Sequence, residues 1–190
     1  MSGDTVGALV LAAGLGRRMG ASKLTLMLEG RPVIAHTLGA VAAAGLPSLL
    51  VTGGHEGAVR AAIGSTPSVF APDHARGLSA SLRAGLAAAP EDWRAALVVL
   101  GDMPFVCATT LRALAAALLN GAGAVVPVHQ GRRGNPVGFA RVHWPALMAL
   151  DGDRGARALL DSLSVVDVPV DDAGVLRDLD RPEDFPAATG

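Results

Sequence analysis

A glycine-rich segment near the amino terminus combines backbone freedom with positive charge. The stretch LAAGLGRRMGASK, residues 11–23, holds three glycines and three cationic side chains: Gly14, Gly16, Gly20, Arg17, Arg18 and Lys23. Glycines let a backbone approach a ligand closely, and successive backbone N–H groups in such a turn form a concavity that binds anions. The segment therefore predicts a polyphosphate site in which Arg18 and Lys23 neutralise charge. The structural alternative is a tight turn from a strand into a helix, with its arginines in solvent.

Two well-known phosphate-binding motifs are not met by this segment. The dinucleotide fingerprint G-x-G-x-x-G, counted from Gly14, places its third glycine at Met19, and the acid expected after the second strand is missing from VTGG at 51–54. The P-loop requires Gly-Lys-Ser/Thr, whereas Lys23 precedes Leu24. A phosphate site here would be of another kind.

Two acidic residues far apart in the chain are candidates for binding a metal ion. Asp102 directly follows the apolar run ALVVLG, and Pro104 favours an extended Met103 that would project Asp102 into the crevice at the carboxyl ends of parallel strands. Asp180, in LDRPEDF, is the second candidate, with Asp178 as a substitute. Mg²⁺ is held in proteins by one or two carboxylates, with phosphate and water completing its shell. The pair predicts a magnesium site, and the structural alternative is that each acid caps a following helix.

Short apolar runs that alternate with Ala/Leu-rich segments must position these residues. We expect strands at 6–11, 48–52, 68–71, 95–100, 124–128, 136–140 and 164–169. We expect helices at 32–44, 56–63, 79–89, 109–119, 144–150 and 156–162, and a short one from Pro182. Thr109 or Thr110 is the expected N-cap of its helix. This alternation predicts a doubly wound, three-layer α/β domain with a mostly parallel sheet and one antiparallel insertion near 136–140.

Composition excludes several other classes of protein. The 190 residues fit one domain, 1–190, and the 51% hydrophobic and 17% charged content is far from that of a disordered chain. No apolar run approaches the roughly 20 residues of a membrane span. A net charge of −1 and 3% aromatic residues argue against a nucleic-acid surface. The single Cys107 and an amino terminus without a basic leader indicate a cytoplasmic protein.

The glycine-rich segment resembles the signature L-A-[AG]-G-x-[GS]-x-R-M-G-x-x-K of MobA-like nucleotidyltransferases. The resemblance runs from about residue 6 to 185 and places four elements in family order: the glycine-rich loop, GDMP, the GNP segment and the terminal acidic element. It implies a nucleotide-diphospho-sugar-transferase-like fold with strand order 3-2-1-4-6-5-7. The variant Ala12-Ala13-Gly14 resembles the molybdenum cofactor cytidylyltransferase branch, which prefers CTP.

The resemblance also implies site residues on the nucleotide side. The catalytic set would be Arg18, Lys23 and Asp102, and Asp102 with Asp180 would hold Mg²⁺. The nucleotide would contact Leu11, Ala12, Ala13, Gly14, Gly16, Arg18, Lys23, Thr52, Gly53, Gly77, Ser79, Ser81 and Asp102. Gly77-Leu78-Ser79 is similar to the family element G-[LM]-[GS]-x-S, although Ser79 and Ser81 could equally begin a helix.

On the acceptor side, GRRGNPVGF at 131–139 resembles the acceptor-facing segment of the cytidylyltransferase branch. Arg132, Arg133 and Asn135 would bind an anionic pterin phosphate there, and a solvated hairpin tip is the alternative. GDRGAR at 152–157 matches another element of that branch, which would shape the acceptor pocket with Asp153 as an acceptor-binding residue. The alternative is a loop in which Asp153 caps the next helix.

The implied reaction is Mg²⁺-dependent transfer of CMP from CTP to the phosphate of a molybdopterin-type cofactor, with release of pyrophosphate. The expected partners are a nucleoside triphosphate, a small phosphorylated acceptor and, transiently, a molybdoenzyme or its chaperone. Three alternatives stay open from the sequence. They are a transferase of this fold that uses GTP or another acceptor, a redox protein that binds flavin or a dinucleotide on this scaffold, and a carrier of the cofactor without turnover.

Overall fold

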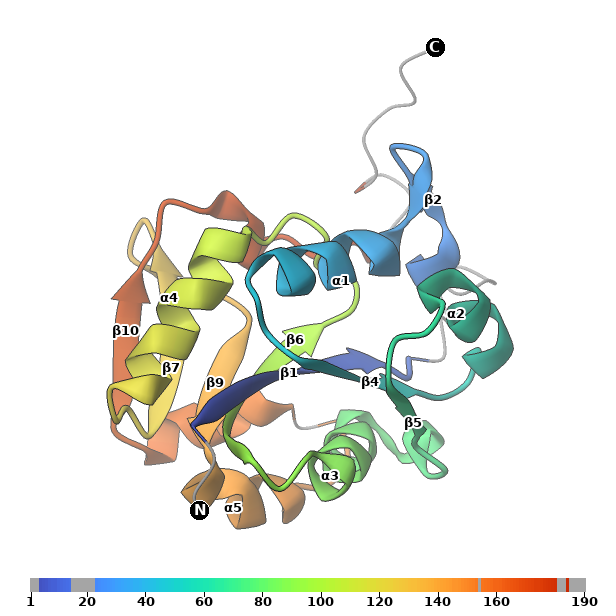
Figure 1. The fold of residues 1–190 in the computed structure, drawn as a ribbon. Helices are drawn as coiled ribbons and strands as arrows, with labels where there is room; N and C mark the ends of the chain where they lie inside the picture. Colours follow the sequence, from blue (N-terminus) through green and yellow to red (C-terminus); the bar gives the residue numbers. More distant parts are fainter. Residues whose placement is uncertain (1–3, 15–22, 154, 181–183, 185–190) are drawn as a thin grey trace.

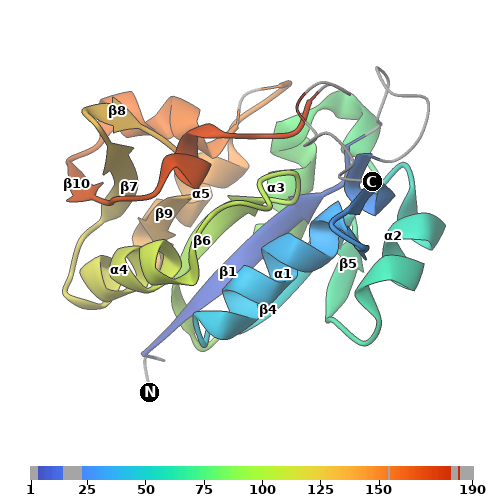
Figure 2. The ribbon, with the colours of Figure 1, turned by 90° about the horizontal axis from the view of Figure 1, so that it is seen from above.

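The computed structural model describes residues 4–14, 23–153, 155–180 and 184. Within that part of the chain, a central sheet is covered by helices on both faces, which confirms the expected three-layer α/β architecture (Figures 1 and 2). The strands are β1 (Thr5–Ala12), β2 (Met27–Leu28), β3 (Arg31–Pro32), β4 (Ser48–Thr52), β5 (Ser68–Phe70), β6 (Trp93–Leu100), β7 (Ala124–His129), β8 (Arg132–Arg133), β9 (Val137–Ala140) and β10 (Val165–Pro169). The α-helices are α1 (Val33–Ala43), α2 (Glu56–Ile63), α3 (Leu78–Ala88), α4 (Ala108–Leu119) and α5 (Trp144–Met148). The 3-10 helices are η1 (Lys23–Thr25), η2 (His74–Arg76), η3 (Arg141–His143), η4 (Ala156–Ser162) and η5 (Ala173–Leu176).

The order of the strands in the main sheet is β10-β7-β9-β6-β1-β4-β5, with β8 beside β7. Strand β1 is parallel to β4 and β6, and β4 is parallel to β5, whereas β9 is antiparallel to both β6 and β7. The expected order 3-2-1-4-6-5-7 and the antiparallel insertion are therefore confirmed. The carboxyl ends of β1, β4 and β6 meet at one edge of the sheet, which is where open α/β sheets bind ligands.

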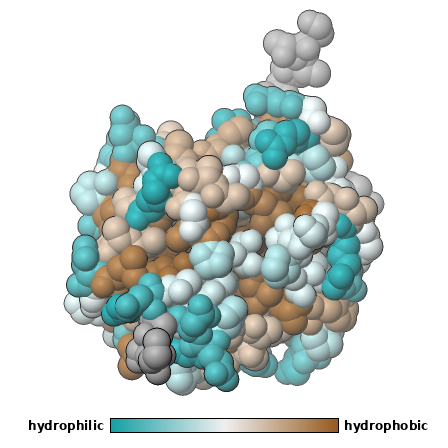
Figure 3. Space-filling view, viewed as in Figure 1, coloured by the Kyte–Doolittle hydropathy of each residue, from teal (hydrophilic) through white to brown (hydrophobic). Residues whose placement is uncertain are grey.

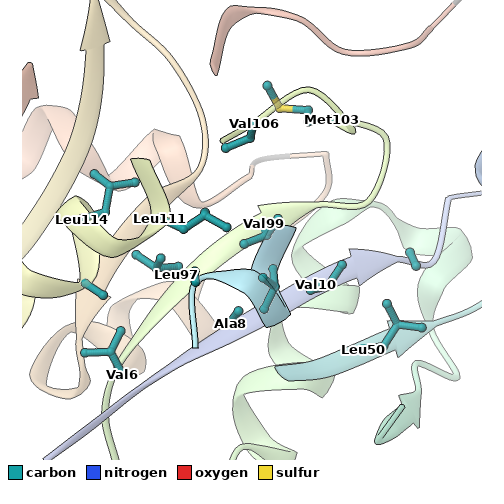
Figure 4. Close-up of a cluster of buried hydrophobic side chains, with 14 of the residues drawn as sticks. Val6, Ala8, Val10, Leu50, Leu97, Val99, Met103, Val106, Leu111 and Leu114 are labelled. Atoms are coloured by element: carbon teal, nitrogen blue, oxygen red, sulfur yellow. The ribbon is translucent and has the colours of Figure 1, made fainter. Parts of the chain in front are cut away.

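Two hydrophobic cores lie on opposite faces of the sheet because side chains alternate along its strands. In β1, Val6, Ala8 and Val10 belong to the core under α1, α2 and α4, while Leu9 and Leu11 belong to the core over α3 and α5. Figure 4 shows the first core, in which Leu111 of α4 lies beside Leu97 and Val99 of β6. Each fully buried aliphatic side chain stabilises the fold by about 1.5–3 kcal/mol. Packing on both faces therefore fixes the positions of the strands, including the ends that carry the candidate site residues.

Several local predictions differ from the structure. The hairpin formed by β2 and β3 was not expected, since its strands are two residues long and its turn relies on positive φ angles at Glu29 and Gly30. Segment 156–162 is a 3-10 helix rather than an α-helix. The expected cap at Thr109 or Thr110 is wrong, because Cys107 is the N-cap residue of α4 and the Thr110 hydroxyl donates instead to Asp172. The helix expected from residue 182 lies outside the described residues.

The surface mixes polar and apolar side chains, as the face in Figure 3 shows. Large apolar side chains with substantial exposure are Met27, Phe70, Leu119, Val142 and Val166. Among the residues that the structure describes, no helix has both the length and the apolar character needed to cross a membrane.

Candidate nucleotide and metal site

The side chains of Lys23, Asp102 and Asp180 meet at the carboxyl edge of the sheet. The Lys23 Nζ atom lies 2.5 Å from Asp102 Oδ2 and 2.5 Å from Asp180 Oδ1. Lys23 and Asp102 are mostly buried, with 22% and 18% of their side-chain surface exposed, while Asp180 is 46% exposed. Residues near both ends of the chain, 157 positions apart in the case of Lys23 and Asp180, are thus brought to one point.

Asp102 is placed by the turn that follows β6. Strand β6 runs parallel to β1 with Leu100 beside Leu11, and the Gly101 N–H donates to the Leu11 carbonyl at 3.0 Å. The Gly101 carbonyl in turn accepts a hydrogen bond from Thr37 Oγ1 at 3.0 Å. A Cβ atom at position 101 would lie 3.0 Å from both the Leu11 carbonyl oxygen and the side chain of Ile34, so this crowded turn favours glycine. The aspartate that follows is directed out over the end of the sheet.

Asp180 is placed by its neighbour Leu179. The Leu179 N–H donates to the Asp102 carbonyl at 3.0 Å, and the Leu179 side chain is fully buried against Leu28 and Val33. The Asp180 N–H donates to Asp184 Oδ2 at 2.8 Å. The backbone of the tail is therefore bonded directly to the turn that carries Asp102, and the two acids are brought together by this contact.

Negative charge is in excess around the Lys23 ammonium. Burial lowers the pKa of Lys23, but the nearby carboxylates of Asp102 and Asp180 outweigh it, and the pKa lies above its usual 10.5. The pKa of Asp178 is raised above 3.8, first by burial and then by the charges of Asp180 and Asp102, although its own backbone hydrogen bond and Lys23 act in the opposite direction. Lys23 is therefore charged at neutral pH, and a further cation would be favoured here.

The two carboxylates suit a divalent metal ion. Because Asp102 Oδ2 and Asp180 Oδ1 are each 2.5 Å from one nitrogen atom, they are at most 5.0 Å apart. An Mg²⁺ ion with oxygen ligands at about 2.1 Å requires the two oxygens to lie within about 4.2 Å of each other, a separation that this upper limit allows. The described residues contain no group of three or more His, Cys, Asp or Glu side chains that could hold a metal. Phosphate and water oxygens would complete the shell, as is usual for Mg²⁺.

A pocket of about 520 Å³ lies against these acids. Its lining includes eight residues predicted to contact the nucleotide: Leu11, Ala12, Ala13, Gly14, Lys23, Gly77, Ser81 and Asp102. Its volume is in the range of small-molecule sites. Gly16 and Arg18, also predicted, lie outside the described residues. Arg76, which opens the segment expected to contact the base and ribose, lines the pocket as well. His74 also lines the pocket and was not predicted.

One wall of this pocket is built by contact between the start of α3 and the loop after α5. The Ser79 N–H and hydroxyl both donate to the Gly152 carbonyl, at 3.2 and 2.7 Å. Gly77 has a φ of 119°, and a Cβ atom there would overlap the Gly152 carbonyl. The close contact between these two backbone segments therefore requires glycine at position 77. The neighbouring Asp153, predicted on the acceptor side, also lines this pocket.

Three other residues predicted to contact the nucleotide, Thr52, Gly53 and Ser79, are not among those that line the pocket. Thr52 is fully buried and donates to the Val69 carbonyl at 3.3 Å. Gly53 packs so closely on Ala13 that a Cβ atom would lie 2.7 Å from the Ala13 carbonyl oxygen. Ser79 is buried at the wall described above, and neither it nor Ser81 is the N-cap residue of α3, which is Gly77.

A smaller pocket of about 210 Å³ brings together Arg132, Arg133 and Asn135. Its other lining residues are Met103, Gly134, Arg157, Val175, Leu176 and Asp178. Met103 and Asp178 place this pocket next to the acid pair. The Arg157 guanidinium donates to the Gly134 and Arg133 carbonyls at 2.8 and 3.3 Å, which fixes the β8 hairpin. Arg157 belongs to the sequence element GDRGAR, which the family resemblance implies as a part of the acceptor pocket.

Residues 8–168 match the MobA-like NTP transferase domain. The chain belongs to this family. Its fold and the family match identify it as a nucleotidyltransferase enzyme domain.

Solved structures resemble the chain over nearly its whole length. Rv0371c from Mycobacterium tuberculosis superposes with a TM-score of 0.86 and 32% identity, covering 95% of each chain. A structure of the same protein in complex with manganese gives a TM-score of 0.83 and 30% identity, again over 95% of each chain. A nucleotidyl transferase from Methanothermobacter thermautotrophicus gives a TM-score of 0.81 and 28% identity, covering 96% of this chain and 94% of that one.

Among curated relatives, the bifunctional protein GlmU of Acidiphilium cryptum is 36% identical over 143 residues. The match covers 73% of this chain and 31% of that protein. The chain thus spans about a third of the length of the curated relatives that it matches.

Proposed function

We propose that the chain transfers a nucleotidyl group from a nucleoside triphosphate to the phosphate of a small acceptor and releases pyrophosphate. Our specific proposal is CTP as donor and a molybdopterin-type cofactor as acceptor. The observation that carries the general proposal is the convergence of Lys23, Asp102 and Asp180 between a nucleotide-sized pocket and a pocket lined by arginines.

The triphosphate would lie where Lys23 and the backbone at Gly14 line the larger pocket, with the nucleoside extending toward Gly77 and Ser81. Asp102 and Asp180 would hold Mg²⁺, which when bound neutralises phosphate charge. Lys23 remains an ammonium at neutral pH because its pKa is raised, so its role is charge stabilisation rather than proton transfer.

In the chemical step, an oxygen of the acceptor phosphate attacks the α-phosphorus atom and forms a new P–O bond. The bond from that phosphorus to the oxygen shared with the β-phosphate breaks, and pyrophosphate leaves with the electron pair. The attacking phosphate is already an anion at neutral pH, so the step needs no dedicated general base. Repulsion between anions is the main barrier, and fixed cationic groups in a partly buried site lower it.

The smaller pocket suits an anionic acceptor. Arg132, Arg133 and Arg157 line it, and Asn135 adds a polar amide. The ion pair between Arg133 and Asp167 at 2.8 Å and the hydrogen bonds of Arg157 hold two of these guanidinium groups in place. Guanidinium groups bind phosphate through two parallel hydrogen bonds, so preorganised arginines favour a phosphorylated acceptor.

The preference for CTP rests on the Ala12-Ala13-Gly14 variant. Ala13 is buried, lines the nucleotide pocket and packs on Gly53. A methyl group at position 13 fills space that a glycine would leave open, which supports selection of the smaller pyrimidine base. Transient contact with a molybdoenzyme or its chaperone would follow from a cofactor product.

The test is pyrophosphate release with each of four nucleoside triphosphates and a panel of acceptors that includes a molybdopterin phosphate and a sugar phosphate. We expect the highest rate with CTP and the pterin acceptor in Mg²⁺. Highest turnover with GTP or the sugar phosphate would instead assign another substrate pair. Nucleotide binding without pyrophosphate release from any pair would favour a carrier, and a flavin absorbance spectrum would favour the redox alternative.

Asp102→Asn tests the site within the same assay. Because the variant removes a charged metal ligand, we expect its rate to fall by about 10²–10³-fold, the usual cost of losing one electrostatic contact to the transition state. Asp151→Asn, at an exposed acid outside both pockets, is the matched control and should retain the wild-type rate. Full turnover by Asp102→Asn would refute the site.

A further inference from the structure

The Lys23 ammonium occupies the place between the two acids that a metal ion would take. It is within 2.5 Å of an oxygen of each, and the same side chain lines the nucleotide pocket. An Mg²⁺ ion held by both carboxylates would also have to lie within about 2.1 Å of an oxygen of each. The ammonium and the metal ion therefore compete for one position.

We infer that Lys23 is the resident cation of the metal site in the free protein, and that it leaves the acids when a divalent ion enters together with the nucleotide. This inference rests on the proposed function for the nature of the two ligands. It assigns Lys23 a second role besides stabilising phosphate charge: it couples the binding of the metal to the binding of the nucleotide.

The lysine side chain is suited to such an exchange. Its ammonium is a point charge with three donors on a flexible four-carbon stem, so it can change partners without a fixed geometry. A bound triphosphate in the pocket that Lys23 lines would offer it new anionic partners. The metal would then take the carboxylates, and each cation would remain paired with negative charge.

A simpler explanation is that Lys23 serves to hold the tail of the chain in place. The structure provides other contacts for that purpose. Leu179 is fully buried and its N–H bonds to the Asp102 carbonyl, while the Asp180 N–H bonds to Asp184. The acids are therefore positioned by backbone bonds and apolar packing, and the ion pair with Lys23 can break without releasing them.

The consequence is a reciprocal coupling of affinities. When the metal ion binds alone, the displaced Lys23 ammonium has only water as its new partner. When the nucleotide binds as well, the ammonium can pair with a phosphate group instead. Each ligand should therefore raise the affinity for the other by the same factor. Couplings between linked sites are typically about 5–150-fold.

The test measures binding of Mn²⁺ alone, followed by electron paramagnetic resonance, to the full chain and to Lys23→Met. The variant keeps a side chain of similar length but removes the competing charge, so we expect it to bind Mn²⁺ about 5–150-fold more tightly than the wild type. Arg76→Met is the matched control, because it also removes one positive charge from the lining of this pocket but leaves the ion pairs of Lys23 with the two acids intact. We expect its effect to be clearly smaller than that of Lys23→Met.

Equal or weaker Mn²⁺ binding by Lys23→Met, or an effect no larger than that of Arg76→Met, would overturn the inference. Lys23→Gln replaces the methionine variant if circular dichroism shows that the latter has lost its fold. The wild type provides a test without any variant, because saturating nucleotide should tighten its Mn²⁺ binding at least fivefold. No tightening with any of the four nucleoside triphosphates would also refute the exchange. These are binding measurements, so a failure of turnover with every acceptor would count against the proposed function and leave this result standing.

Discussion

Replacing Asp172 with alanine should destabilise the protein and disturb the acid pair together. This carboxylate is 6% exposed and accepts three hydrogen bonds. The Cys107 N–H and the Thr110 hydroxyl donate to Oδ2 at 2.8 and 2.6 Å, and the Gly174 N–H donates to Oδ1 at 2.9 Å. Asp172 thus joins the start of α4, which follows the Asp102 turn, to the η5 segment that leads into the tail.

The expected loss can be worked from these contacts. A hydrogen bond to a charged group contributes about 1.5–3 kcal/mol, and a donor left buried without a partner costs about 1–3 kcal/mol. The Thr110 hydroxyl is deeply buried, whereas Cys107 is exposed and water can replace part of its bond. We therefore expect Asp172→Ala to lower the free energy of unfolding by about 3–5 kcal/mol, a large share of the roughly 5–15 kcal/mol of a typical domain.

Urea denaturation at pH 7, followed by circular dichroism, measures this loss. Asp171→Ala is the matched control, since that neighbouring acid is exposed and such surface changes stay within about 0.5 kcal/mol. Asp172→Asn should be intermediate, because one amide oxygen can still accept from Cys107 and Thr110. The reasoning is wrong if the free energies of unfolding of Asp172→Ala and Asp171→Ala differ by less than about 1 kcal/mol, which is the smallest cost expected for a buried donor left without a partner.

Three further predictions test the pockets and the charge of the tail. Gly77→Ala should weaken nucleotide binding at least tenfold in calorimetry, because its Cβ atom would displace the Gly152 carbonyl from the pocket wall; wild-type affinity would contradict this. Asp178→Asn should raise the melting temperature at pH 7 in metal-free buffer, because a carboxyl whose pKa is raised in the folded state destabilises that state once ionised. The gain should shrink as the pH falls and vanish below 3.8, where the carboxyl becomes protonated in both states, and a pH-independent difference would refute the cause. Arg157→Gln should raise the KM for the acceptor and leave kcat within a few-fold, because it releases the Gly134 carbonyl of the hairpin; an unchanged KM in the pyrophosphate assay would rule out this positioning role.

The elements of the fold were predictable where local signals are strong. The buried strands have continuous apolar runs, so β1, β4 and β6 were found within two residues of their ends. Asp102 was predictable because a carboxylate directly after such a strand must lie at the carboxyl edge of the sheet. The order of the strands came from the family resemblance, since apolar runs do not show which strands are neighbours.

Residues that act through backbone groups were missed or misplaced. Asp172 binds two backbone N–H groups and one hydroxyl, and no residue type in the sequence marks those N–H groups as partners. Asp153 was assigned to the acceptor side, and it lines the larger pocket beside the Gly152 carbonyl that Ser79 binds. Such contacts depend on the three-dimensional path of loops, which sequence spacing does not determine.

The two acids of the site differ in how their positions arise, and this difference bears on the chemistry. Asp102 follows from a strand end, but Asp180 has no strand before it and depends on Leu179, whose side chain is buried and whose N–H bonds to the Asp102 carbonyl. Neither of these contacts involves the carboxylates or Lys23. The interactions that fix where the acids lie are therefore separate from the ion pair with Lys23, and the cation exchange that we propose would leave the acids in their places.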